Sequence, residues 1–147
     1  MKTIIASFAL LAAPLASYAA SCSEVGSIIK VENTEIGPNE YVNFYIKSDT
    51  PDFTVKAVQG PKFQLVEGDP PLIIKGNKWT EVAFKGVNWT CEIPLALHLP
   101  KPIIRQVSST EQFEGYVTYV IGRQGKNYRG QTVTAIPGGT KISLKYR

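Results

Sequence analysis

The feature that most constrains the fold is an alternation of side chains with a period of two residues. It is clearest in the run Phe113 to Gly122, FEGYVTYVIG. One face of this run carries Val117, Tyr119 and Ile121, and the other carries Tyr116, Thr118 and Val120. β-Branched and aromatic residues at this spacing, closed by glycine, predict a strand inside a sheet.

Shorter runs of strand character fill the rest of the chain, separated by turns rich in glycine and proline. They cover residues 27–33, 41–47, 53–58, 63–66, 72–75, 79–84, 87–93, 103–108, 131–135 and 141–146. No window of a dozen residues has the apolar spacing of a helix, and 12 glycines and 10 prolines interrupt the chain too often for long helices. The pattern predicts an all-β fold, an antiparallel β-sandwich, with a small β-barrel as the alternative.

The first 19 residues predict export. Lys2 gives a positive start, an apolar stretch follows from Ile4 to Leu15, and Ser17 and Ala19 offer the small residues of a cleavage site. The apolar stretch is shorter than the roughly 20 residues that a membrane-spanning helix needs. We therefore expect a signal peptide over residues 1–19 and a single β-domain over residues 20–147, secreted to an extracellular or periplasmic space, with no transmembrane segment after signal removal.

The two cysteines, Cys22 and Cys91, suit an oxidising compartment. One disulfide between them would close a loop of about 70 residues, worth roughly 4 kcal/mol in the chain-entropy model. The alternative is a free reactive thiol, although no histidine neighbours either cysteine in the sequence.

Charge is unevenly distributed along the chain. The formal net charge of +4 divides into −3 over residues 20–100 and +6 over residues 101–147, the remaining charge being Lys2. The predicted basic patch consists of Arg123, Lys126, Arg129, Lys141, Lys145 and Arg147. One interpretation is a surface for an anionic partner, such as teichoic acid, phospholipid head groups or an acidic protein. The other is a solvated strand face whose lysines discourage edge-to-edge pairing. Nucleic acid is not an expected partner, because export removes the usual encounter.

Aromatic side chains are the candidate ligand-binding residues. Tyr41 and Tyr45 fall on the predicted wet face of one strand, Tyr116 lies opposite predicted core positions, and Trp79 and Trp89 occur near turns. Exposed aromatic rings on a sheet can hold sugar rings or a protein partner. The alternative is that these rings fill the second face of a sandwich.

One further triplet, which begins at Asn88, has the N-glycosylation pattern, which matters only in a eukaryotic host.

No constellation in the sequence predicts an enzyme. His98 is the only histidine, and the serine motif G-x-S-x-G is missing. Glu111 and Glu114 are the nearest candidates for a pair of catalytic carboxylates, but their spacing in sequence does not define their separation in space. No phosphate-binding glycine loop or metal-ligand spacing occurs. We expect a non-enzymatic protein without a cofactor or a metal site.

Two groups of motifs resemble the AMIN-like domains of secreted bacterial envelope proteins. The first is 41–46, YVNFYI, followed by 51–55, PDFTV. The second is 113–118, FEGYVT, with Ile121-Gly122 and Tyr128-Arg129 beyond it. The resemblance covers about residues 40–147. It implies a non-enzymatic β-sandwich of the envelope or exported space, with cell-wall glycan as the ligand of the wider family, and it transfers no binding residues.

The chain departs from that pattern in two places. Residues 142–145, ISLK, stand where an acidic, valine-rich closing strand is expected, and the cysteine pair is not part of the pattern. The sequence therefore supports two functional hypotheses. The first is a domain that binds cell-wall or surface polysaccharide. The second is a secreted effector or inhibitor that binds a host protein. A small hydrolase that uses His98 is a third and weaker interpretation.

Overall fold

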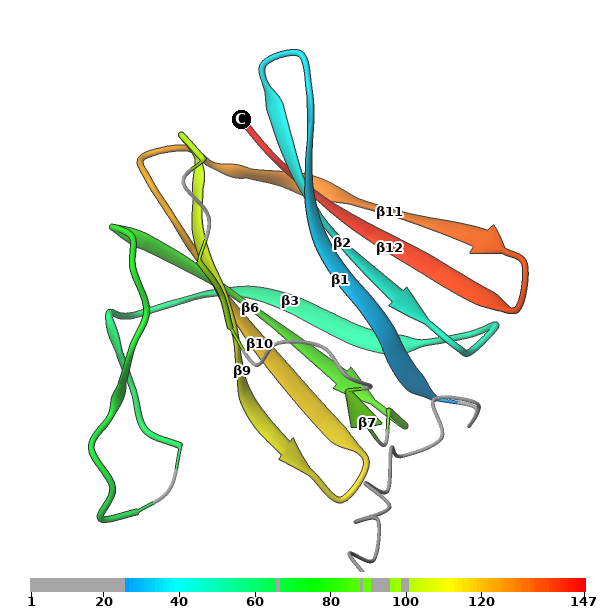
Figure 1. Cartoon of the computed structure of the whole chain (residues 1–147), viewed down its shortest axis with the longest axis horizontal. Helices are drawn as coiled ribbons and strands as arrows, with labels where there is room; N and C mark the ends of the chain where they lie inside the picture. Colours follow the sequence, from blue (N-terminus) through cyan, green and yellow to red (C-terminus); the bar gives the residue numbers. More distant parts are fainter. Residues whose placement is uncertain (1–25, 66, 88, 91–95, 99–100) are drawn as a thin grey trace, which may run out of the picture.

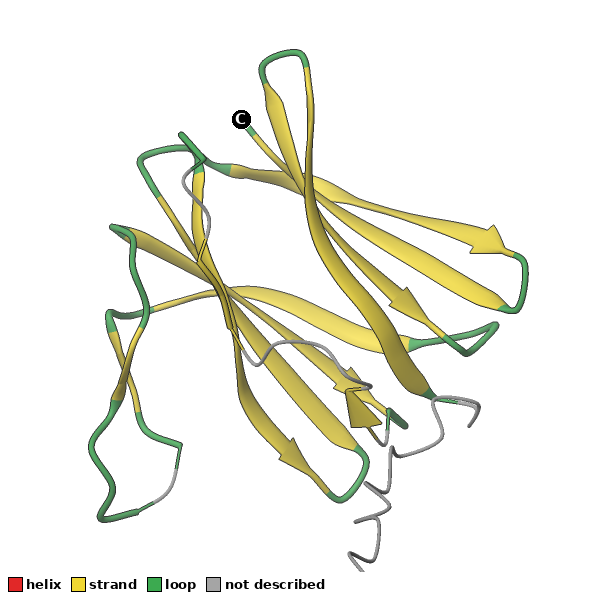
Figure 2. Ribbon diagram, in the orientation of Figure 1, coloured by secondary structure: helices red, strands yellow, loops and turns green. Residues whose placement is uncertain are grey.

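The computed structural model describes residues 26–65, 67–87, 89–90, 96–98 and 101–147. The predicted signal peptide, Cys22, Asn88 and Cys91 lie outside these residues, so the signal peptide, the disulfide and the glycosylation site stay predictions. All regular elements in the described part of the chain are strands, as Figure 2 shows. The prediction of an all-β protein is thereby confirmed.

Two five-stranded sheets make up most of the fold (Figure 1). Sheet A has the strand order β11-β12-β2-β1-β7. Its members are β1 (Ser27–Ile36), β2 (Asn39–Ile46), β7 (Trp89–Thr90), β11 (Tyr128–Ile136) and β12 (Gly139–Tyr146). Its neighbouring strands are antiparallel except β1 and β7, which pair in parallel.

Sheet B has the strand order β3-β6-β10-β9-β8, with every pair antiparallel. Its members are β3 (Asp52–Val58), β6 (Lys78–Lys85), β8 (Ala96–His98), β9 (Ile104–Phe113) and β10 (Tyr116–Arg123). A small hairpin of β4 (Lys62–Phe63) and β5 (Leu72–Ile73) forms a third unit beside sheet B, on the side away from sheet A (Figure 1). The two large sheets do not close into one, which favours the sandwich over the barrel.

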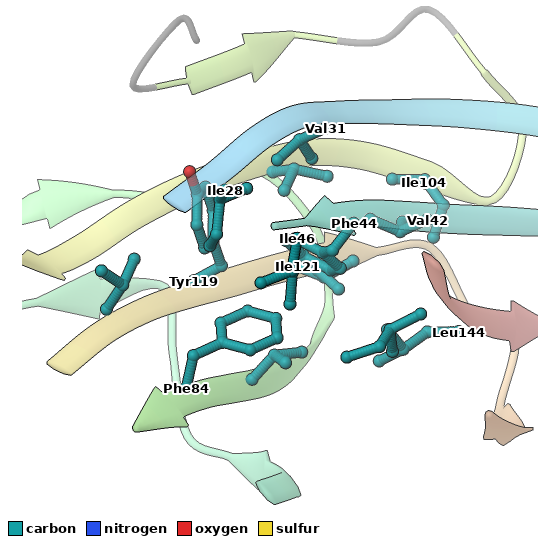
Figure 3. Packing of buried hydrophobic residues seen from close by; sticks show 14 of the residues in the cluster. Ile28, Val31, Val42, Phe44, Ile46, Phe84, Ile104, Tyr119, Ile121 and Leu144 are labelled. Atoms are coloured by element: carbon teal, nitrogen blue, oxygen red, sulfur yellow. The ribbon is translucent and has the colours of Figure 1, made fainter. Parts of the chain in front are cut away.

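The core lies between the inner faces of the two sheets. Figure 3 shows side chains of both sheets pointing toward one another. The Phe44 ring of sheet A lies 5.1 Å from the Phe84 ring and 5.2 Å from the Tyr119 ring of sheet B, measured between centroids. The alternation predicted these inner positions, and Val117, Tyr119 and Ile121 of β10 are indeed buried. Val82, Ile142 and Leu144 extend the same apolar layer.

One predicted strand boundary is wrong. Phe113 ends β9, Tyr116 begins β10, and these two residues pair across a tight hairpin. Glu114 and Gly115 form the turn, with φ of 47° and 80°. Two successive residues at positive φ are typical of the turn that matches the twist of two antiparallel strands. The run FEGYVTYVIG therefore contains the end of one strand, a turn and most of the next strand.

A buried carboxylate ties sheet A to the beginning of β9. Glu40 points inward from β2 and is 2% exposed. Its two carboxylate oxygens accept hydrogen bonds from the backbone N–H groups of Ile103 and Ile104, both at 2.8 Å. Hydrogen bonds to an ionised acceptor are stronger than neutral ones, and a buried N–H without a partner is costly. Glu40 therefore fixes the start of β9 against sheet A.

We predict that Glu40→Gln lowers the free energy of unfolding by about 2–4 kcal/mol, because one backbone N–H then faces an amide group instead of a carboxylate oxygen. Denaturant unfolding followed by tryptophan fluorescence measures the loss. Glu35→Gln is the matched control, since Glu35 is exposed in the same hairpin and only pairs with Lys101 at 3.3 Å. The control should change stability by less than about 0.5 kcal/mol. Equal effects of the two substitutions would contradict this role of Glu40.

Candidate binding sites

The predicted aromatic residues are divided between opposite faces of the sandwich. Tyr41 and Tyr45 lie on the outer face of sheet A, because Val42, Phe44 and Ile46 occupy the inner positions of β2. Tyr116 and Trp79 lie on the outer face of sheet B. Trp89 is in β7 at the edge of sheet A, and its side chain is outside the described part of the structure. The five residues therefore do not form one common platform.

The β4–β5 hairpin is anchored to the outer face of sheet B by the segment that follows it. Ile74 is fully buried and packs against Gly122, where an added Cβ would collide with the backbone of Lys75. The backbone N–H of Lys75 donates to the side-chain oxygen of Gln106 at 3.0 Å. The absence of a side chain at Gly122 lets the covering segment approach the sheet closely.

Trp79 belongs to this anchor. Its indole N–H donates to the backbone carbonyl of Ile74 at 3.0 Å, and its ring fills the space above Gly60. The side chain is half-buried in these contacts. Trp79 thus holds the hairpin in place, and its position does not support the predicted role as an exposed platform for a ligand.

A groove of about 380 Å³ lies between the hairpin and the outer face of sheet B. We call it the hairpin groove. Phe63 and Leu65 line the hairpin side, and Glu81, Glu111, Tyr116 and Thr118 line the sheet side. This volume falls in the range of small-molecule sites, which combine apolar walls with a few polar groups. The sequence singled out Tyr116 and Glu111, but it gave no sign that Phe63 and Leu65 would face them.

Some polar groups of the hairpin groove already interact with other groups of the protein. The Thr118 hydroxyl donates to a carboxylate oxygen of Glu111 at 3.2 Å. Glu81 forms an ion pair with Lys56 at 2.8 Å. Tyr116 is 48% exposed, so its ring remains available to a ligand. Carboxylates that accept hydrogen bonds, next to an exposed ring, can hold a molecule rich in hydroxyl groups.

The outer face of sheet A holds a different network, centred on Tyr45. The Tyr45 hydroxyl donates to a carboxylate oxygen of Glu32 at 2.5 Å, and Lys30 forms an ion pair with the same carboxylate. The ammonium groups of Lys30 and Lys141 lie 5.1 and 6.0 Å from the centre of the Tyr45 ring. Tyr45 is half-buried between them, and so is Tyr41 on the same strand.

The hydrogen bond between Tyr45 and Glu32 shifts the pKa of both groups. It raises the pKa of Tyr45 to about 12, with a smaller contribution from burial. The pKa of Glu32 lies below its usual value, first because of Lys30 and then because of the Tyr45 hydroxyl. The charged carboxylate and the neutral phenol are therefore the stable pair over a wide range of pH.

The predicted basic patch is only partly formed. Arg123 is wrongly placed in it, because the residue is 7% exposed and points between the sheets. Its guanidinium donates to the Lys126 carbonyl and the Thr80 hydroxyl and lies 6.0 Å from the Tyr146 ring. Burial lowers the pKa of Arg123 and raises that of Tyr146. Inward alternation at the end of β10 accounts for this burial.

The other basic residues lie at the surface. Lys126 is exposed in the turn between β10 and β11. Lys141 and Lys145 alternate with inner residues of β12 and so share the outer face of sheet A. Arg129 and Arg147 are exposed next to the inward-facing Tyr128 and Tyr146. The strand periodicity thus brings Lys141, Lys145 and Arg147 onto one face. Arg129 lies beside them on β11, at an irregular position where the pairing register with β12 shifts between Tyr128 and Gln131.

The residues considered for catalysis lie on β8, on β9 and in the turn between β9 and β10. Glu111, on β9, accepts a hydrogen bond from the Thr118 hydroxyl on β10, and Glu114 lies in the turn between these strands. His98 is in β8, and nothing is described of its side chain. Within the described ranges, no group of three His, Cys, Asp or Glu side chains could hold a metal ion, and no helix is long and apolar enough to cross a membrane.

Comparison with known proteins gives no assignment: no protein-family model and no curated protein matches the chain.

We predict that Glu32→Gln brings the pKa of Tyr45 down toward the ordinary tyrosine value of 10, because the amide no longer favours the protonated phenol. NMR titration of the Tyr45 ring carbon that carries the hydroxyl measures this shift. In the unmodified protein, the bond stabilises the native state below about pH 10, and this stability is lost as the pH rises toward about 12. Glu35→Gln serves as the control on the same strand. An unchanged pKa in Glu32→Gln would show that the bond does not form in solution.

Proposed function

We propose that the chain is a secreted or periplasmic, non-enzymatic binding domain for a cell-wall or surface polysaccharide. The observation that supports this most is the hairpin groove, in which the exposed ring of Tyr116 lies beside the oxygen atoms of Glu111 and Thr118. A sugar has an apolar ring face and a rim of hydroxyl groups, which are the two surfaces that this arrangement complements. The resemblance to AMIN-like domains points to the same class of ligand.

The polarity of the hairpin groove favours neutral or N-acetylated sugars over acidic ones. Two carboxylates, Glu81 and Glu111, line it, and Lys56 neutralises only the first. A uronic acid or a phosphate group in the groove would meet the negative charge of Glu111, and like charges at short range repel. Hydroxyl and N-acetyl groups would instead donate to this carboxylate.

We predict that Tyr116→Ala weakens binding to soluble peptidoglycan fragments by about tenfold, because the stacking surface of the groove is lost. Isothermal titration calorimetry measures the dissociation constant. Tyr41→Ala is the matched control, since it removes a half-buried tyrosine from the opposite sheet. Peptidoglycan fragments and neutral glucans that both fail to bind the unmodified protein would refute the proposal.

A protein ligand is the second candidate, and one observation favours it. Phe113 pairs with Tyr116 at the tip of the β9–β10 hairpin and is 66% exposed, while Leu65 across the groove is 46% exposed. Large exposed apolar side chains close together are typical of protein interfaces. Phe113→Ala separates the two candidates, because Phe113 lies outside the groove lining and should matter for a protein but not for a sugar.

The proposed location favours a disulfide between Cys22 and Cys91 over the free thiols that are the alternative. Cys22 lies five residues before β1, and Cys91 directly follows β7. Both cysteines lie in segments outside the described residues, so the disulfide rests on the sequence and on the proposed compartment. We predict that the mature protein takes up no alkylating agent under denaturing conditions until it has been reduced. Mass spectrometry counts the modified thiols, and two modified cysteines without reduction would contradict the proposed disulfide.

A further inference from the structure

The outer face of sheet A carries positive charge that the described fold does not neutralise. Lys141 and Lys145 lie on β12, Arg129 is exposed at the start of β11, and Arg147 follows β12. Among the described residues, no carboxylate forms an ion pair with any of these four. Lys30 is on the same face, but its charge is matched by Glu32. We call the four unmatched residues the cationic strip.

The cationic strip is long and narrow. Lys141, Lys145 and Arg147 follow one strand direction, and six residues of strand cover about 20 Å. Arg129 widens the strip at the end nearest Arg147, since Tyr128 pairs with Tyr146. Between the charges lie Ser143 and Asn43, which pair across β12 and β2 and are buried. The strip therefore offers a row of cations on a surface whose central side chains are buried.

The carboxylate of Glu32 is an example of an oxyanion that is bound on this face. Its carboxylate is bound by the Lys30 ammonium and by the Tyr45 hydroxyl, and the charge of Lys141 also acts on it. This is an ion pair with an additional hydroxyl donor, formed within the protein itself. Toward Lys145 the next outward position of β1 is Thr34, so no second carboxylate continues the row.

We propose that the cationic strip binds a linear anionic polysaccharide, whose successive carboxylate or phosphate groups lie along β12. The site is distinct from the hairpin groove, which is on the other sheet. A chain with charges at regular intervals matches a row of cations that follows a strand, and the charges are complementary. Two large exposed apolar side chains lie on this face of sheet A, Ile36 and, at the irregular start of β1, Ile29, and both are on β1, which β2 separates from β12. The other described ones are on sheet B, on the β4–β5 hairpin or, like Val133, on the opposite face of sheet A, so the strip itself carries none. Insertion into a lipid surface, which requires such side chains, is therefore not favoured.

Affinity for polygalacturonate, measured by calorimetry at low salt, tests the proposal. We expect the double substitution Lys141→Gln/Lys145→Gln to weaken binding by about tenfold, which corresponds to two exposed ion pairs. Glu32→Gln should strengthen binding by about threefold, since Lys30 then becomes available. Added salt should weaken all of these complexes, because the contacts are solvent-exposed.

The matched control is Lys62→Gln/Lys85→Gln, which removes the same charge from exposed positions on β4 and β6. If this control weakens binding as much as the strip variant does, the polysaccharide is attracted by the net charge of the protein and not by the strip, and the proposal fails. Stronger binding to vesicles of phosphatidylglycerol than to polygalacturonate, lost in the strip variant, would overturn the choice of ligand. Tyr116→Ala should leave polygalacturonate binding unchanged, so failure of the hairpin groove and failure of the strip can be told apart.

Discussion

The packing of Phe44 against Phe84 and Tyr119 is the contact on which the rest of the structure depends. It joins sheet A to sheet B at the centre of an apolar layer, with ring centroids about 5 Å apart. Inward-facing side chains of β1, β2, β6, β9, β10 and β12 form this layer. The two candidate binding surfaces described above lie on the outer faces of the sheets.

The two outer faces differ because, among the described residues, a hairpin is anchored on sheet B and no such unit lies on sheet A. On sheet B, the β4–β5 hairpin is held by Ile74 and Lys75, and the space beside it becomes a groove with an aromatic ring and carboxylates. On sheet A, long cationic side chains and tyrosines lie directly on the strands. The same sandwich thus presents a concave surface of acidic and aromatic character and a flat surface of positive charge. These surfaces suit ligands of different chemistry.

The alternation of side chains was sufficient to predict the strand content and the inner residues of β2, β10 and β12. It failed where one local pattern is compatible with two structures, such as a strand or a turn. Glu114 and Gly115 were read as part of a strand although they form a turn, and the inward position of Arg123 was not recognised. Trp79 was a candidate ligand-binding residue, with packing on the second face of the sandwich as the alternative, and its indole N–H donates to the Ile74 carbonyl. Each error concerns a residue near the end of a strand, where periodicity gives the least information.

The sequence by itself determined the all-strand character of the chain and which side chains share a face, since both follow from the two-residue period of an extended backbone. The tertiary structure alone decided which outer face is covered. Covering depends on contacts between residues far apart in the chain, such as Ile74 with Gly122 and Lys75 with Gln106. No local pattern encodes such pairs, because they form only when the segment after the β4–β5 hairpin meets β9 and β10, which come later in the chain.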